Sequence, residues 1–157
     1  MGVLKIGAES KLDREVRAKN AERALKVLSA AQYSGVVPGG GAAYFHCIPA
    51  LDSLSVDGDT AYGVEIVRRT LAAPLRQILD NAHVSSSAVI MEHIRSAGPS
   101  ATYDVLGERV VDAYEAGIMD VANVLRIVLQ TAVSGALMAV TTDTIIYHKD
   151  PEQALAP

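Results

Sequence analysis

Three consecutive glycines, Gly39 to Gly41, separate two β-prone valines and a proline from a run of good helix formers. Each glycine costs roughly 1 kcal/mol of helix or strand stability relative to alanine, so the triplet argues against a regular element across it. Two explanations stay open. One is a turn between helices that needs positive φ angles. The other is a backbone that must come into contact with an anionic group, such as a phosphate at a helix N-terminus.

The composition favours packed helices. Half of the 157 residues are hydrophobic, but aromatic residues make up only 4%, with one Phe and no Trp. The apolar content is therefore mainly Ala, Val, Leu and Ile, in a chain about as long as one domain. We predict a mainly α fold with a short hairpin and terminal strands. The mean hydropathy of +0.21 suggests apolar surface that another body covers.

The charge distribution and the single cysteine exclude several classes of protein. The net charge is −4, and residues 1–34 carry seven basic and four acidic side chains. No basic cluster with interleaved aromatic residues occurs, so we expect no nucleic-acid partner. Cys47 stands alone, which excludes a disulfide within the chain. No signal peptide opens the sequence, so we expect a cytoplasmic protein.

Residues 121–140 form the one stretch apolar enough to suggest a membrane span. Arg126 lies within it and would cost roughly 2.5–3.5 kcal/mol at the bilayer centre. Asn123, Gln130 and Ser134 share its face at helical spacing. We therefore expect a buried helix with a narrow polar stripe and no membrane partner.

Local patterns predict the remaining elements. A short strand is expected at residues 3–8, followed by a long charged helix that Ser10 caps and that ends near Ser34. After the glycines, we expect a helix that is kinked or broken at Pro49 and another that begins at Pro74. A hairpin is expected to turn at Leu106-Gly107. The other predicted elements are an amphipathic helix at 60–73, a helix at 88–98, a terminal strand at 141–149 and a disordered tail at 150–157.

Few side chains form a pattern that points to chemistry. The histidines are scattered, and His46 and Cys47 are neighbours that a helix would point about 100° apart, so we predict no metal site from them. An acidic succession could hold Mg²⁺ or form a solvated turn, and it comprises Glu108, Asp112, Glu115 and Asp120. Asp120 is placed to cap the helix that follows it.

The order of several motifs resembles the C-terminal third of the bacterial-type (group I) chaperonins. These motifs are GVLKIGA, GVVPGGGAA, APLRQILDNA, YEAGIMD and VLRIVLQTAVSGALMAVTTDTII, and together they cover nearly the whole chain. The resemblance implies a strand and helix of the intermediate domain at residues 1–34. It implies the C-terminal half of the ATP-binding equatorial domain, a multi-helix bundle, at residues 35–149.

The resemblance also implies a set of nucleotide-contacting residues. Gly39 and Gly40 would lie against the ribose and phosphates of ATP or ADP, and Asp120 would contact the sugar. Asp104 would lie beside the adenine, and Val105 and Leu106 would border it. In this reading the glycines allow backbone and nucleotide to touch.

Two departures from the family pattern lead us to predict no catalytic residue and no ATP hydrolysis in this chain. The loop that binds phosphate and Mg²⁺ belongs to the family's N-terminal segment, outside these residues. The apical domain, which binds unfolded polypeptides and the co-chaperonin, follows that segment in the family and also lies outside these residues. Arg23, twelve residues before Gly35, occupies the position of the family's catalytic aspartate. A guanidinium cannot position an attacking water as a carboxylate does.

Three functions stay open. The first is a fragment of an ATP-dependent chaperonin that assists protein folding, supplying ring scaffold and part of the ATP pocket. The second is a free-standing helical adaptor without ATPase activity. The third is a small phosphate-binding enzyme that uses the glycine loop. We further expect weak nucleotide binding, and homo-oligomers rather than a monomer.

Overall fold

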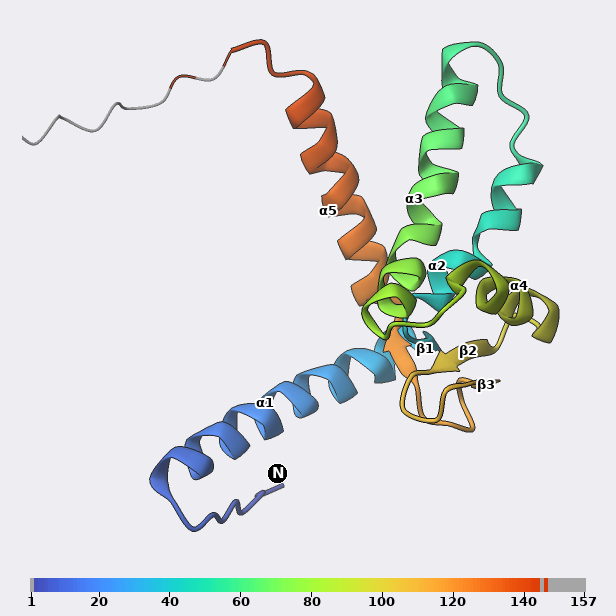
Figure 1. The fold of residues 1–157 in the computed structure, drawn as a ribbon. Helices are drawn as coiled ribbons and strands as arrows, with labels where there is room; N and C mark the ends of the chain where they lie inside the picture. The colour runs from blue at the N-terminus through green and yellow to red at the C-terminus, as the bar shows by residue number, and fades with distance from the viewer. Residues whose placement is uncertain (1, 145, 147–157) are drawn as a thin grey trace, which may run out of the picture. The chain divides into compact units, whose positions relative to one another are not determined.

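The protein is mainly helical, as predicted, in a computed structural model that describes residues 2–144 and 146. These residues form five α-helices, one 3₁₀-helix and two small two-stranded antiparallel sheets (Figure 1). The chain divides into two compact units, the first running to Leu125 and the second starting at Arg126.

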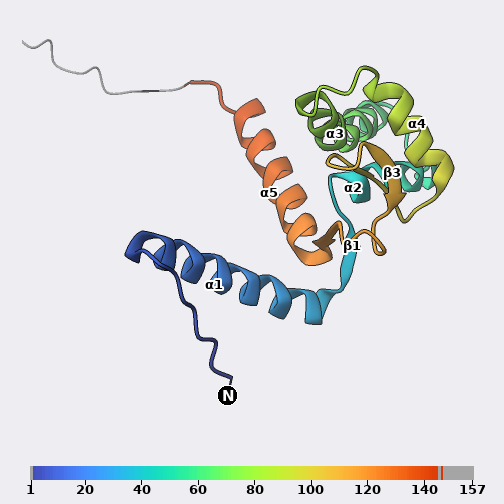
Figure 2. The same ribbon diagram turned by 60° about the horizontal axis from the view of Figure 1, so that its bottom comes forward.

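The first unit begins with the predicted long helix, α1 (Lys11–Ser34). The Ser10 hydroxyl caps it by accepting a hydrogen bond of 3.0 Å from the Asp13 amide. Gly35, with φ of +74°, ends the helix and leads into the first strand (Figure 2). No residue of α1 is buried. The helix therefore depends on local interactions, its cap above all.

The predicted strand at residues 3–8 is wrong, because these residues form no regular structure. A strand needs a partner for its backbone groups. Val3 and Leu4 are 80% and 64% exposed, so nothing in the described chain covers them. The predicted terminal strand at 141–149 is not formed at residues 141–144 or 146, and its other residues lie outside the described ones, as does the tail at 150–157.

Two sheets join distant parts of the first unit. Strand β1 (Val36–Pro38) pairs with β4 (Met119–Val121), which places Val37 opposite Asp120. Strands β2 (Ala101–Asp104) and β3 (Arg109–Asp112) form the predicted hairpin. The first pairing spans more than half of the chain and brings the glycine triplet to the residues that precede the last helix.

The helices between these sheets differ from the prediction at one point. Helix α2 (Ala42–His46) ends before Pro49, which lies in the 3₁₀-helix η1 (Ile48–Ser53), as expected. Helix α3 (Asp59–Asn81), however, runs through Pro74 without a break. Its buried stripe of Leu71, Leu75 and Leu79 lies on both sides of the proline, so packing offsets the backbone hydrogen bond that Pro74 cannot donate.

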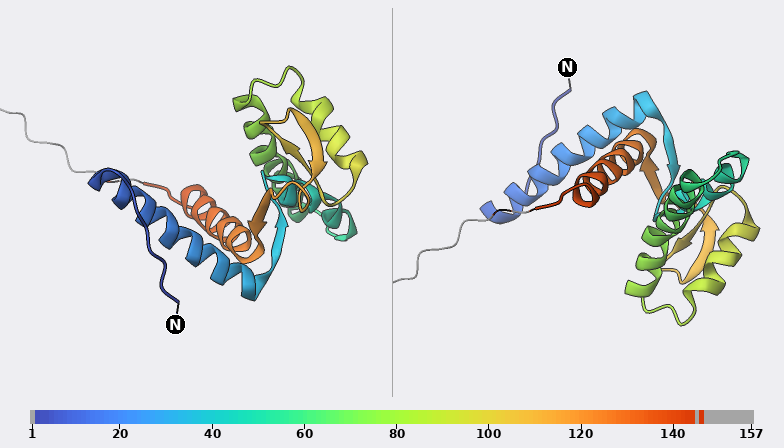
Figure 3. Two further views of the ribbon diagram at one scale, coloured as in Figure 1. Left: turned by 90° about the horizontal axis from the view of Figure 1, so that it is seen from below. Right: turned by 90° about the horizontal axis from the view of Figure 1, so that it is seen from above.

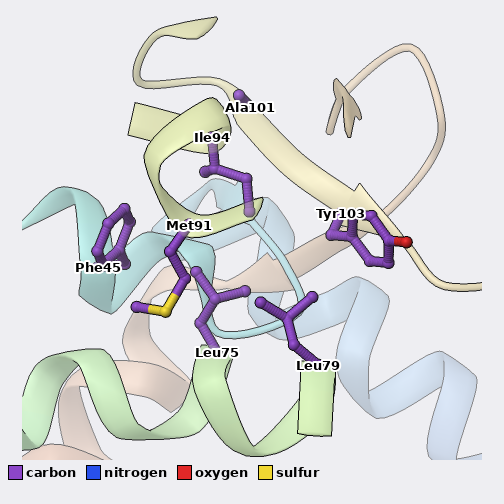
Figure 4. Packing of buried hydrophobic residues seen from close by; sticks show 7 residues of the cluster. All are labelled: Phe45, Leu75, Leu79, Met91, Ile94, Ala101 and Tyr103. Atoms are coloured by element: carbon purple, nitrogen blue, oxygen red, sulfur yellow. The ribbon is translucent and has the colours of Figure 1, made fainter. Parts of the chain in front are cut away.

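The core of the first unit forms where α2, α3, α4 (Ser87–Ala97) and the hairpin meet. Both views of Figure 3 show the green α3, the olive α4 and the gold hairpin together. Figure 4 shows the packed side chains, which are Phe45, Leu75, Leu79, Met91, Ile94, Ala101 and Tyr103. This core holds the hairpin in place against the helices, and the hairpin carries part of the candidate site.

Helix α5 (Ala122–Val140) starts at the end of the first unit and makes up most of the described second unit. The helix was predicted, but its predicted burial is wrong for this chain, since none of its residues is buried. Its apolar side chains stand exposed, among them Ile127, Leu137 and Met138. By length and hydropathy alone α5 could cross a membrane, a criterion that core helices of soluble proteins also meet.

Candidate functional site

The glycine triplet forms a tight turn between β1 and α2, and each of its positions disfavours a side chain. Gly40 and Gly41 have φ of +69° and +78°, which other residues rarely adopt. At Gly39 a Cβ would lie only 3.0 Å from the backbone carbonyl of Ile118. At Gly41 a Cβ would lie 2.7 Å from the amide nitrogen of Leu75 in α3. The turn thus combines positive φ angles with two close backbone contacts.

Hydrogen bonds hold Gly39 on both sides. Its amide donates to the Ile118 carbonyl at 2.8 Å, which continues the pairing of β1 with β4. Its carbonyl accepts from the Thr102 hydroxyl at 2.9 Å and from the Ala42 amide at 3.3 Å. Among the described residues no hydrogen bond from the Gly40 or Gly41 amide is found. Both residues are half-buried, and their amides have no partner within the described chain.

Helix α2 contributes little to such a site by its dipole. It has only five residues, and a macrodipole grows from many aligned peptide units. What the turn offers instead is a stretch of backbone without side chains, because all three of its residues are glycine. Of the two explanations for the triplet, the structure shows the turn, and its unpaired amides keep the anion-contact explanation open.

Asp120 lies beside this turn. It is half-buried in β4, opposite Val37, and the preceding residue, Met119, pairs with Pro38 just before Gly39. The predicted role of Asp120 as a helix cap is wrong, because Asp120 is a strand residue and α5 starts only at Ala122. The antiparallel pairing with β1 supplies its backbone partners instead. The structure thus brings Gly39, Gly40 and Asp120 together.

Tyr44 connects the helix after the turn to the start of α5. Its hydroxyl donates to the Leu125 carbonyl at 2.7 Å. Burial raises the pKa of this hydroxyl, and the negative charge of Asp120 raises it further. The phenol therefore stays protonated and keeps donating to Leu125 over the whole neutral range.

Asp104, Val105 and Leu106 lie at the turn of the hairpin. The Asp104 carboxylate accepts from the Leu106 and Gly107 amides, both at 3.0 Å, and so closes the turn. Val105 and Leu106 are exposed, Leu106 almost completely at 97%. Asp104 follows Thr102 by two residues, so both side chains project from the same face of β2, the face that meets Gly39. Within the described chain we find no direct contact between these three residues and the glycine turn.

The acidic succession does not gather into one cluster. Asp112 accepts from the Ser100 hydroxyl and from the Tyr114 and Glu115 amides, and these bonds, that of Ser100 first, lower the pKa of its carboxyl. In the described ranges no group of three or more His, Cys, Asp or Glu side chains is placed to hold a metal ion. The carboxylate of Asp112 serves the turn after β3.

Sequence reasoning missed the two side chains that organise the site, Thr102 and Tyr44. Both act over long sequence separations, 63 residues from Thr102 to Gly39 and 81 from Tyr44 to Leu125. No local pattern signals such a bond. Arg23 is a residue of helix α1, none of whose residues is buried.

The comparison with known families decides what kind of protein this is. A profile of the TCP-1/cpn60 chaperonin family matches residues 3–150. The chain belongs to the TCP-1/cpn60 chaperonin family. Its fold is similar to that of a group III chaperonin solved in the open state, with a TM-score of 0.80 and 26% sequence identity over 90% of this chain. The chain covers 30% of that chaperonin chain. The family is confirmed, while the more specific resemblance to group I stays a prediction.

Proposed function

We propose that this chain is the C-terminal third of a bacterial-type (group I) chaperonin subunit. The family match over residues 3–150 and the 30% share of the group III chain support a segment of this size. In this proposal residues 1–34 belong to the intermediate domain and residues 35–149 to the equatorial domain. The group I assignment rests on the series of motifs along the chain, from GVLKIGA at its start to VLRIVLQTAVSGALMAVTTDTII near its end.

In the whole subunit this segment would supply part of the ATP pocket. The observation that carries this proposal is the glycine turn, which offers two amides without partners among the described residues and lies beside Asp120. Amide donors suit phosphate and ribose oxygens, and a carboxylate suits ribose hydroxyls. Gly39, Gly40 and Asp120 would hold the ribose and phosphate end, and the base would lie near Asp104, Val105 and Leu106. The nucleotide, with Mg²⁺, supplies the hydrolysable phosphoanhydride when it is bound.

The same proposal gives the segment a scaffold role. A chaperonin subunit works in homo-oligomeric rings in the cytoplasm, and the equatorial domain holds those rings together. Unfolded polypeptides and the co-chaperonin would bind only through the apical domain, which lies outside this segment. We propose no nucleic-acid and no membrane partner.

An ADP titration followed by amide NMR tests the pocket. We expect binding of roughly millimolar affinity or weaker, because only part of the pocket is present. Shifts should concentrate at the glycine turn, at Asp120 and at the hairpin turn. These shifts should disappear in Gly40→Val, because the valine side chain would lie against the Thr102 hydroxyl at a residue with positive φ. Gly63→Val, at an exposed glycine of α3 with open space around it, is the matched control. Micromolar binding, or shifts that ignore Gly40→Val, would contradict the proposal.

We also propose that this chain alone does not hydrolyse ATP. Arg23 stands where the family's pattern has an acid, so no carboxylate is there to position water. A phosphate-release assay should show no steady turnover, and Arg23→Asp should not restore it in this segment. Turnover that depends on the glycine turn would instead support a small phosphate-binding enzyme.

The second candidate function is a helical adaptor derived from a chaperonin. Arg23 favours it, since an adaptor has no need of the catalytic acid. An adaptor must close its own core without further chain, so the mass of the protein in solution separates the two candidates.

A further inference from the structure

Thr102 is the one polar side chain that is buried in the described part of the chain, with 0% exposure. It lies in the middle of the hairpin, on β2, and its hydroxyl reaches across 63 residues to the Gly39 carbonyl at 2.9 Å. Other threonines behave differently. Thr70, for example, bonds the carbonyl of Ile66 four residues earlier in its own helix. The bond of Thr102 therefore connects two elements.

This bond controls a single peptide unit, which contains both the Gly39 carbonyl and the Gly40 amide. The unit is planar and trans, so its C=O and N–H vectors point in opposite directions. With the carbonyl turned toward buried Thr102, the Gly40 amide is directed away from it. The position of a Gly40 Cβ would lie 3.2 Å from the Thr102 oxygen, so the hydroxyl packs against this same unit.

The contacts of Gly39 and Gly41 fix the conformation of the turn before any ligand binds. The Gly39 amide bonds Ile118 at 2.8 Å, and Gly41 packs against the backbone of Leu75. Both polar groups of Gly39 are thus used inside the protein, while the amides of Gly40 and Gly41 bond nothing in the described chain. Ordering a flexible loop on binding costs affinity, and a loop fixed beforehand avoids that cost.

We propose that Thr102 is a positioning residue for nucleotide binding, which sets the direction of the Gly40 amide through the Gly39 carbonyl. The inference rests on the proposed nucleotide pocket. It adds that the affinity of the glycine turn for nucleotide depends on a residue of the hairpin. Thr102 itself does not contact the nucleotide.

The test compares Thr102→Val, which keeps the shape and removes the hydroxyl, with Thr102→Ser, which keeps the hydroxyl. Thr70→Val removes a comparable hydroxyl-to-carbonyl bond far from the turn and serves as the control. Each variant is titrated with ADP and Mg²⁺ by amide NMR. Amide hydrogen exchange at Gly39, Ala42 and Ile94 is measured without nucleotide, and the thermal midpoint is recorded.

We expect Thr102→Val to weaken ADP binding about 3- to 10-fold, as the loss of one fixed hydrogen bond predicts. Exchange at Ala42, whose amide bonds the freed Gly39 carbonyl, should accelerate by a similar factor, while exchange at core residue Ile94 changes little. Thr102→Ser should bind within about 2-fold of the wild type, and Thr70→Val should bind equally well. If Thr102→Val is too unstable to titrate, Thr102→Ala against Thr102→Ser isolates the same hydroxyl.

The outcomes separate the two proposals. Equal ADP affinity in the wild type and Thr102→Val would overturn the role of Thr102 and leave the pocket standing. Equal losses in the serine and valine variants would also overturn it, because the hydroxyl would then not matter. A wild type that shows no ADP-dependent shifts would overturn the pocket itself, and the role of Thr102 with it.

Discussion

At the scale of single residues, Gly41 shows why the turn can hardly change. Its φ of +78° disfavours any side chain, and a Cβ would lie 2.7 Å from the Leu75 nitrogen, where the backbone of α3 cannot move aside. Gly41→Ala should therefore lower the free energy of unfolding by about 2–4 kcal/mol.

Urea denaturation measures this change, with Gly63→Ala as the control. Gly63 lies inside α3 with open space around it, so alanine there should raise stability by about 0.5–1 kcal/mol. A Gly41→Ala protein as stable as the wild type would show that α3 and the turn separate easily in solution.

Tyr44 makes the stability of the folded protein depend on pH in the alkaline range. Burial and then the charge of Asp120 raise its pKa in the folded protein above the value of about 10 in the unfolded chain. The unfolded chain thus loses the proton first as the pH rises. The contribution of Tyr44 is complete below pH ~10 and declines as the pH rises toward the folded pKa.

Urea denaturation of the wild type and Tyr44→Phe from pH 8 to 11 tests the direction of this pH dependence. The stability advantage of the wild type should shrink above pH ~10, because phenylalanine does not titrate. An advantage that stays constant or grows across this range would show that the folded pKa is not raised.

At the scale of elements, local signals predicted the helix at residues 11–34 and the hairpin well. The Ser10 cap and the Leu106-Gly107 turn act within a few residues, and both are present in the structure. The strand predicted at residues 3–8 is not formed, because a strand depends on a partner that local sequence does not reveal. The prediction that Asp120 caps a helix is wrong for the same reason, since the partner strand of β4 lies more than 80 residues earlier.

Pro74 shows packing that overrides a local preference. Proline inside a helix costs up to about 3 kcal/mol, yet α3 continues through it because Leu71, Leu75 and Leu79 are buried on either side. Pro74→Ala restores one backbone donor at an exposed position, and it also gives the unfolded chain more freedom.

We expect Pro74→Ala to raise the free energy of unfolding by about 1–2 kcal/mol, measured by urea denaturation. Ala73→Pro, at the exposed residue before it, should instead destabilise by at least about 3 kcal/mol. A Pro74→Ala protein less stable than the wild type would mean that the proline ring itself supports the contact with the glycine turn.

At the scale of the whole molecule, α5 determines how the chain can exist in solution. No residue of α5 is buried, and Leu137, Met138 and Val140 are 60%, 69% and 84% exposed. Covering several hundred Å² of such surface is worth several kcal/mol at about 25 cal/mol per Å², comparable with the stability of a small domain. In the proposed chaperonin subunit the rest of the equatorial domain would cover this face. In this chain alone, a second copy is the available partner, most simply in a symmetric dimer.

The mass of the protein in solution tests most directly whether this chain is part of a larger body. Size-exclusion chromatography with light scattering at tens of micromolar should give an oligomer, with a dimer as the simplest case. Leu129→Glu together with Leu137→Glu, which charges one apolar face of α5, should shift it toward the 16.5 kDa monomer. Lys11→Glu with Lys19→Glu, which changes charges on α1, should not. A wild type that elutes as a clean monomer would contradict the account, because the chain would then close its own core as a free-standing adaptor must.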